Sequence, residues 1–129
     1  MALGFSTTLR NARADAITTA AGASALLKIY DGTRPATGGT VTTLLATLTC
    51  NATFAPGAAS GVLTLNSIAS GTAVATSTAT WARLTTSGGT FVMDMSVGTS
   101  GADCNLNTTS IVSGGTVSVT SAVFTEGNA

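Results

Sequence analysis

The groups that could do chemistry in this chain are five acidic side chains and two cysteines, because the sequence contains no histidine. Without histidine, the chain lacks the commonest general base, the commonest metal ligand and the usual switch near neutral pH. No two acidic residues stand close together in the sequence, and none lies in the alternating pattern of a calcium-binding loop. The five are Asp15, Asp31, Asp94, Asp103 and Glu126.

Two carboxylates and one thiol still need an interpretation. Asp94 and Asp103 could face each other from distant strands, as the two carboxylates of a glycosidase do. A working pair would also need neighbours that shift a pKa, and the alternative is that both residues solvate turns and one strand face. Cys104 could be a nucleophile, but without a histidine to form the thiolate it is better interpreted as a small core residue. We predict that the chain is not an enzyme and has no catalytic, cofactor-binding or metal-binding residues.

Charge is scarce along the whole chain. Charged residues make up 8% of the sequence and the net charge is zero, against about 25% charged residues in ordinary soluble domains. Nucleic-acid affinity depends on Lys and Arg, and the five basic residues are scattered, so we predict no nucleic-acid partner. A neutral, threonine-rich surface also gives little repulsion between copies, which suits a protein that works in an assembly.

Neither a membrane span nor an export signal is predicted. No apolar run approaches the ~20 residues needed to cross a bilayer, so we expect no membrane partner. Residues 16–27 are rich in small and apolar side chains, but two threonines and Gly22 interrupt them, unlike a signal peptide. Cys50 and Cys104 could form a disulfide, yet in a chain without an export signal two thiols are more often free and buried.

Residues 6–21 predict the one helix of the chain, with Ser6 or Thr7 as its N-cap and Gly22 as its end. Apolar residues recur along it at helical spacing, but they are mostly alanine and bury little area. Two interpretations are open: the helix packs against a sheet of its own chain, or it is an arm laid onto a neighbouring subunit. The predicted stripe consists of Leu9, Ala12 or Arg13, Ala16, Ile17 and Ala20.

Alternating apolar and polar residues predict a series of β-strands after this helix. The strongest signal is a hairpin over residues 73–97, whose Ser87-Gly88-Gly89 turn supplies the positive φ angles of a tight turn. On its first strand, Trp81 lies on the same side as Ala79 and Arg83. On its second strand, one side is expected to fill the interior, with Phe91, Met93, Met95 and Val97. The other predicted strands lie in 23–30, 41–49, 61–66, 104–111 and 116–125.

The order of these elements predicts the fold class. No helix is visible between the predicted strands, which excludes a parallel α/β sheet. The spacing instead indicates antiparallel neighbours, so we predict a mainly β chain: an antiparallel β-sandwich or jelly roll with one N-terminal α-helix. We expect a single domain over residues 1–129, made of a helical arm (1–22), the β-sandwich (23–125) and a polar tail (126–129).

Tyr30 and Trp81 are the two aromatic residues that could serve a binding site. Both could stack on sugar rings, because their rings combine a large apolar face with a polar group. Single aromatic residues on strands are more often anchors of the core or of a subunit interface. Both interpretations stay open for these two side chains, and we expect Trp81 to be buried in the core or the interface.

Five segments of the chain resemble a recurring group of small proteins encoded among the structural genes of tailed bacteriophages. They span most of the sequence, and the resemblance rests on their order and combination, because none is a catalytic motif. The segments are FSTTLRNARADAI (5–17), LLKIYDGTRPATGG (26–39), TATWARL (78–84), MDMSVGTSGADCNLNTTSI (93–111) and SAVFTEGNA (121–129).

The resemblance implies a virion component, and the role that fits it best is a capsid decoration (cement) protein. Such proteins are commonly β-sandwich or jelly-roll trimers that sit on the outer capsid, where major capsid subunits meet. The implied partners are therefore the major capsid protein and further copies of this chain, and the implied location is the outer capsid surface of the virion. The family supplies no functional residues to carry over.

Five residues are candidates for contacts in such an assembly. We expect the helix, Tyr30 and the 31–39 loop to contribute to trimer or capsid contacts. One alternative is a head-fibre or tail-associated adhesin module that binds host glycans through an exposed Trp81 or Tyr30. Another is a tail-tube or tail-completion protein, which would form rings. The candidate interface residues are Leu9, Arg13, Tyr30, Arg34 and Trp81.

Overall fold

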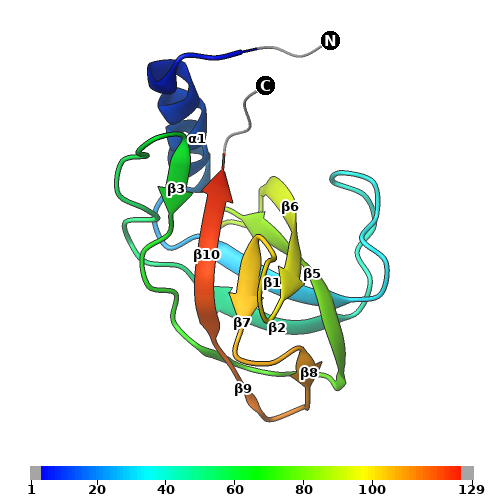
Figure 1. The fold of residues 1–129 in the computed structure, drawn as a ribbon. Coiled ribbons are helices and arrows are strands. Elements are labelled where there is room, and N and C mark those ends of the chain that lie inside the picture. Colours follow the sequence, from blue (N-terminus) through cyan, green and yellow to red (C-terminus); the bar gives the residue numbers. More distant parts are fainter. Residues whose placement is uncertain (1–3, 126–129) are drawn as a thin grey trace.

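A computed structural model describes residues 4–125, so the predicted tail (126–129) and the first residues of the predicted arm lie outside the described residues. One helix precedes a series of strands (Figure 1). The elements are α1 (Thr7–Ala21), β1 (Leu26–Asp31), β2 (Leu44–Thr49), β3 (Val62–Thr64), β4 (Gly71–Thr72), β5 (Ser77–Thr85), β6 (Phe91–Gly98), β7 (Cys104–Leu106), β8 (Ser110–Ile111), β9 (Thr116–Val117) and β10 (Val119–Thr125).

The ends of α1 follow from its capping residues, as predicted. The Ser6 hydroxyl accepts a hydrogen bond from the Leu9 amide at 3.1 Å, which satisfies one of the free amides of the first turn. Gly22 adopts a φ of 70°, and its amide donates to the Thr18 carbonyl. This left-handed conformation favours glycine and ends the helix.

The side of α1 that is buried differs from the predicted stripe. Ala14 and Ala21 are buried, whereas Leu9 is 45% exposed. The reason is a pair of polar contacts with the segment before β3: Asn11 Oδ1 accepts from the Gly61 amide, and Asp15 Oδ1 accepts from the Ala58 amide, both at 2.7 Å. These bonds set the rotation of the helix about its axis.

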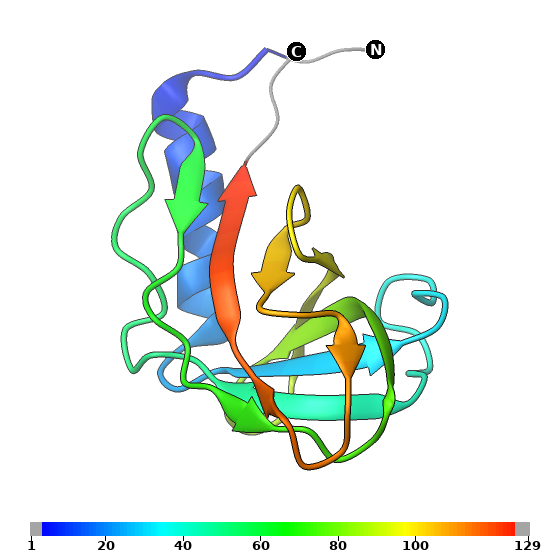
Figure 2. The same ribbon diagram turned by 60° about the horizontal axis from the view of Figure 1, so that its bottom comes forward.

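The helix therefore packs on its own chain in this structure. It lies beside β3 and β10 in both views (Figures 1 and 2). Its weak apolar face is compensated by the two hydrogen bonds and by the close approach that alanine permits. Of the two interpretations of residues 6–21, the structure matches the first, a helix packed against a sheet.

The strands form one curled, eight-stranded mixed sheet, a half-barrel, with the order β2-β1-β5-β6-β7-β10-β3 and with β8 attached to β5 (Figure 2). β4 and β9 form a separate two-stranded ladder. A mainly β chain with one N-terminal helix is thus confirmed. The β-sandwich or jelly roll is not, because the large sheet curls on itself instead of facing a second large sheet.

Antiparallel pairing was predicted throughout, and this is wrong for β6 and β7, which pair in parallel. Parallel neighbours usually need a connection of a dozen or more residues. Here residues 99–103 fold back along β6, because the Asp103 carboxylate accepts from the Ser96 amide at 3.1 Å and from its hydroxyl at 3.0 Å. The chain then re-enters the sheet in its former direction.

The predicted hairpin is formed by β5 and β6, and a register shift changes its interior face. Met93 pairs with Leu84, but the next pair is Phe91 with Thr85, so one residue of β6 is skipped. Beyond this irregularity the alternation of side chains is reversed. Met95 is buried, while Phe91 is 38% exposed and lies on the opposite face, against Gly38 and Arg83. The expectation that Phe91 fills the interior is wrong.

The main core lies on the inner face of the curled sheet. β1 alternates as its sequence predicts, with Leu27 and Ile29 inside. Phe54, in the connection between β2 and β3, is also buried. The other large buried side chains come from most strands of the sheet: Leu45, Leu48, Leu63, Leu84, Met95 and Leu106. Tyr30 and Trp81 are also buried, but outside this core cluster.

Candidate functional site

The aromatic residues singled out from the sequence lie together on the outer face of the sheet. Tyr30 on β1 stands opposite Trp81 on β5. Their rings stack, with centroids 4.5 Å apart and planes 17° from parallel. The exposed fraction is 5% for Tyr30 and 1% for Trp81, so the chain itself encloses both rings.

The cover over this stack is the loop between β1 and β2. The Trp81 indole Nε1 donates to the Asp31 carbonyl and to Thr42 Oγ1, each at 3.0 Å, so the ring binds both ends of the loop. The Asp31 carboxylate accepts from the Thr43 amide at 3.0 Å, which closes the base of the loop. A compact surface loop whose ends lie close together is an Ω-loop, a class that often carries function.

The tip of the loop is held by an ion pair. Arg83 and Asp94 face each other across the β5–β6 hairpin and form two parallel bonds, Nε to Oδ1 at 2.7 Å and Nη2 to Oδ2 at 3.1 Å. The same groups reach the loop, because Arg83 Nη2 donates to the Gly39 carbonyl at 3.0 Å and Asp94 Oδ2 accepts from the Gly38 amide at 3.2 Å. The pair thus pins two successive glycines to the sheet.

This ion pair is largely enclosed, with side-chain exposures of 11% for Arg83 and 4% for Asp94. Burial raises the pKa of Asp94, but the hydrogen bonds from Arg83 and the Gly38 amide, together with nearby positive charge, hold that pKa below the usual range of a carboxyl. The bond to Asp94 raises the pKa of Arg83. Both groups are therefore charged near neutral pH.

Arg83 also joins the ion pair to the aromatic rings. Its guanidinium carbon lies 5.3 Å from the centre of the Trp81 ring and 5.0 Å from the centre of the Phe91 ring. Such cation–π contacts add to the packing of the site. We name the set of Tyr30, Trp81, Arg83, Phe91 and Asp94 the Trp81 cluster. In this structure the cluster holds the Ω-loop on the outer face of the sheet.

The five candidate interface residues divide into two groups. Tyr30 and Trp81 are brought together and are buried. Arg34 stands on the exposed part of the Ω-loop, while Leu9 and Arg13 lie on the exposed side of α1. The helix and the loop occupy opposite sides of the molecule in both views (Figures 1 and 2). The exposed candidates thus form two separate surfaces.

The sequence analysis missed the partnership of Arg83 with Asp94, although a signal for it was present. A hairpin centred on Gly88-Gly89 pairs residues at equal distances on either side of the turn. That pairing places Arg83 opposite Asp94 and close in space, where opposite charges attract. The hydrogen bonds of this ion pair with the Gly38 amide and the Gly39 carbonyl had no such local signal.

Each acidic side chain in the described part of the chain accepts a hydrogen bond that holds structure together. Asp15 binds the segment before β3, Asp31 closes the Ω-loop, Asp94 binds Arg83 and Asp103 binds Ser96. The two carboxylates considered for glycosidase chemistry, Asp94 and Asp103, are thus committed to different partners. Within residues 4–125, no three side chains of the metal-ligating types gather into a group that could hold a metal ion.

The two cysteines are buried and unpaired, as predicted. Burial raises the pKa of the Cys50 thiol to about 11. Burial, with smaller effects of Cys50 and Asp103, raises the pKa of Cys104 to about 12. Both groups are protonated thiols near neutral pH, a form that is a poor nucleophile.

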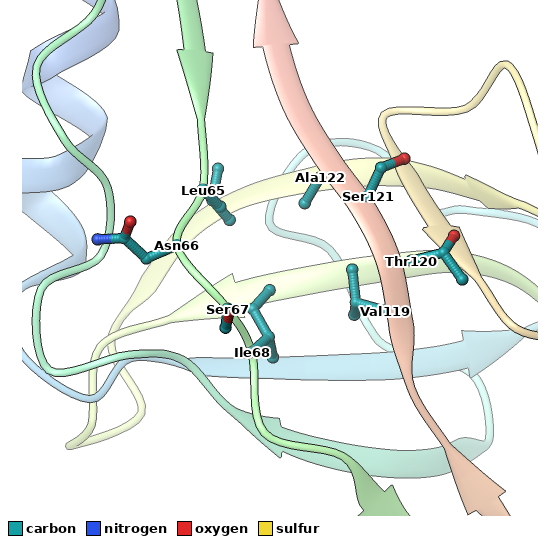
Figure 3. Close-up of a pocket in the computed structure, with 8 residues that line it drawn as sticks. All are labelled: Leu65, Asn66, Ser67, Ile68, Val119, Thr120, Ser121 and Ala122. Carbon is teal, nitrogen blue, oxygen red and sulfur yellow. The ribbon is translucent and has the colours of Figure 1, made fainter.

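A groove separates β10 from the segment that follows β3 (Figure 3). Its volume is about 310 Å³, and it is bordered by residues 65–68 and 119–122. The side chains of Leu65, Ile68 and Val119 point into it, while Thr120 and Ser121 point to the β7 side (Figure 3). A bond of 3.0 Å from the Leu65 amide to the Ala122 carbonyl closes one end. The lining contains no charged residue, so the groove suits a neutral group.

No helix among the described residues combines the length and the apolar character that crossing a bilayer requires. Comparison of the chain with protein-family models, with curated proteins and with solved structures found no match.

Proposed function

We propose that this chain is a structural protein of a tailed-bacteriophage virion, which binds the outside of the capsid at junctions between major capsid subunits and stabilises the shell. The proposal rests on the resemblance of its five segments to phage structural proteins and on one observation of the site. The groups best suited to ligand chemistry hold a surface loop on the sheet instead. These groups are Trp81, Arg83 and Asp94. A rigid scaffold that presents loops suits a binding protein whose partner is a large surface.

A decoration protein stabilises a shell by mass action. It binds the assembled lattice and not the free subunits, so each occupied site adds RT ln(1 + [L]/Kd) to the stability of the assembled state. Many weak contacts on one shell can therefore sum to strong protection. No reactive group is needed for this role.

The exposed candidates indicate where the capsid would be contacted. Leu9 and Arg13 on α1, and Arg34 on the Ω-loop, are exposed, whereas Tyr30 and Trp81 are enclosed. The Arg13 guanidinium lies over the Phe5 ring, 4.7 Å from its centre. We therefore assign the capsid contact to the outer side of α1 and to the Ω-loop. Assembly as a trimer and jelly-roll packing, both implied by the resemblance, stay predictions that an experimental structure of the assembled protein would test.

The adhesin alternative needs an exposed aromatic platform for glycans. Exposures of 1% for Trp81 and 5% for Tyr30 do not favour it. Stacking on a sugar would require the Ω-loop to leave the rings, which breaks the bonds from Trp81 to both loop ends.

The decisive test adds purified protein to expanded capsids of the encoding phage that lack it. We expect co-sedimentation with the capsids and a higher temperature of capsid disruption. Charge reversal at Arg13 and Arg34 should weaken binding, while Ser100→Glu, which adds a negative charge at an exposed position outside α1 and the Ω-loop, should not. Bare capsids that resist heat as well as the decorated ones would refute the stabilising role. Negative-stain images of antibody-labelled virions separate capsid, fibre and tail locations.

A further inference from the structure

The charges of this molecule are unevenly distributed. No charged residue occurs from Pro35 to Ala82 or from Cys104 to Thr125. These two stretches supply β4, β8 and β9, and the labelled strands β8 and β9 lie at the end of the molecule away from the start of α1 (Figure 1). We define residues 69–78 and 107–118 as the neutral end. The residues of the neutral end themselves carry only hydroxyl, amide and apolar side chains, and the Asp31 carboxylate meets their edge through a hydrogen bond with Ser77.

Two large apolar side chains project from the neutral end. Val74 is 65% exposed and Val112 is 60% exposed, the highest values among the exposed large hydrophobic residues in the described part of the chain. Leaving such side chains in water is unfavourable, and burying them against a partner would remove that cost. Large exposed apolar groups set in an uncharged surface have the composition of an interface core, which is depleted in charge.

The two valines stand on loops that are locked to each other. The Ala73 amide donates to the Gly115 carbonyl and the Gly114 amide donates to the Ala73 carbonyl, both at 2.8 Å. In addition, the Ser113 amide donates to Thr76 Oγ1 at 3.0 Å. The surface is therefore formed before any partner arrives, so association loses little conformational entropy.

We propose that the neutral end is the surface through which copies of this chain associate, with Val74 and Val112 of one copy packed against the same residues of another. A symmetric contact brings identical surfaces together, so every charge on it would meet a like charge nearby. The residues of the neutral end carry no charge of their own, and the Asp31 carboxylate lies at their edge, against Ser77. A second copy supplies the matching neutral surface around Val74 and Val112.

This inference goes beyond the proposed function, because it concerns a contact between copies and needs no capsid. The residues assigned to capsid contact lie outside the neutral end. A chain could therefore hold its neighbours through one surface and the shell through others. The test below uses purified protein alone, so its failure is distinguishable from failure of the capsid proposal.

The experiment is sedimentation equilibrium of the full chain across micromolar to submillimolar concentrations. We expect wild-type protein to associate reversibly. Val74→Lys with Val112→Lys should weaken association about thirtyfold or more, the effect of losing an interface hot spot. Leu9→Lys, which places the same charge on an exposed apolar residue of α1, is the matched control and should leave association unchanged.

A charge-swap mixture tests whether the contact is between copies of the same surface. Val74→Glu with Val112→Glu should be monomeric alone, and mixing it with the double lysine variant should restore association. Val74→Thr with Val112→Thr, nearly isosteric, covers the case in which the charged variants do not fold. The proposal is overturned by a wild-type protein that is monomeric throughout, by association that survives the double lysine and double threonine variants, or by equal weakening in Leu9→Lys.

Discussion

Tyr30 and Trp81 stack across neighbouring strands, with ring centroids 4.5 Å apart, on the sheet face that turns away from the main core. The stack forms a second, smaller apolar centre between the sheet and the Ω-loop. A loop that would otherwise move in solvent is thereby attached through aromatic burial, two indole hydrogen bonds and an ion pair. The conformation of the Ω-loop depends on these few side chains.

Trp81→Ala should be among the most destabilising single changes in this chain. Removing a fully buried indole leaves a cavity and typically costs about 3–5 kcal/mol of unfolding free energy. Trp81→Phe keeps most of the apolar volume but loses the bonds to Asp31 and Thr42, so we expect a smaller loss of about 1–2 kcal/mol. Urea unfolding followed by far-UV circular dichroism measures both. Leu9→Ala, at an exposed position outside the neutral end, should stay near wild type, and equal losses in all three variants would contradict this account.

Asp94→Asn should loosen the tip of the Ω-loop. The change removes the charge that pairs with Arg83 and leaves a nearly buried guanidinium without its counter-ion, for a loss of about 2–4 kcal/mol. Hydrogen exchange of residues 36–40 should become faster than in wild-type protein. Asp103→Asn, which changes a carboxylate outside the Trp81 cluster, is the control and should leave exchange in this loop unaltered.

Stability should decline as the solution becomes acidic. The pKa of Asp94 is lower in the folded chain than in an unfolded one, where it is about 4, so the stabilisation is fully present above about pH 4. It is lost as the pH falls through the folded-state pKa and the carboxylate is protonated. Because the chain contains no histidine, its midpoint in urea should hardly change between about pH 5 and 8. In Asp94→Asn the acid-induced loss should be smaller, and an unchanged loss would exclude this carboxylate as its source.

Asn11→Ala should weaken the docking of α1. The Gly61 amide is buried and would lose its acceptor, which costs about 1–3 kcal/mol. Asn11→Asp keeps an oxygen at this position and should retain most of the stability. Limited proteolysis within residues 7–21 reports docking directly. Faster cleavage is expected in the alanine variant, and equal rates in the two variants would show that this bond does not hold the helix.

Cys50 and Cys104 should react slowly with thiol reagents in the folded protein. Their pKa values of about 11 and about 12 leave little thiolate near neutral pH, and their burial blocks access. Ellman's reagent should modify both within minutes in denaturant and only through unfolding in native buffer. Rapid modification of native protein would place at least one thiol at the surface.

Features carried by neighbouring residues could be predicted from the sequence. The bounds of α1 follow from Ser6 and Gly22, and the inward side of β1 follows from its alternation of side chains. The hairpin followed from its glycine turn. For the candidate site, the sequence indicated Tyr30 and Trp81. The Arg83–Asp94 pair and the neutral end were not predicted, because the few charged residues are scattered along the chain.

What only the tertiary structure decided depends on contacts between residues far apart in the chain. The register shift near Phe91, the rotation of α1 by Asn11 and the bond from Gly38 to Asp94 have no local pattern, because each joins segments that meet only after folding. By itself, the sequence determined a mainly β chain with one capped helix, since propensity and periodicity act over a few residues. Tertiary hydrogen bonds fixed the rotation of α1 and held the Ω-loop over Trp81.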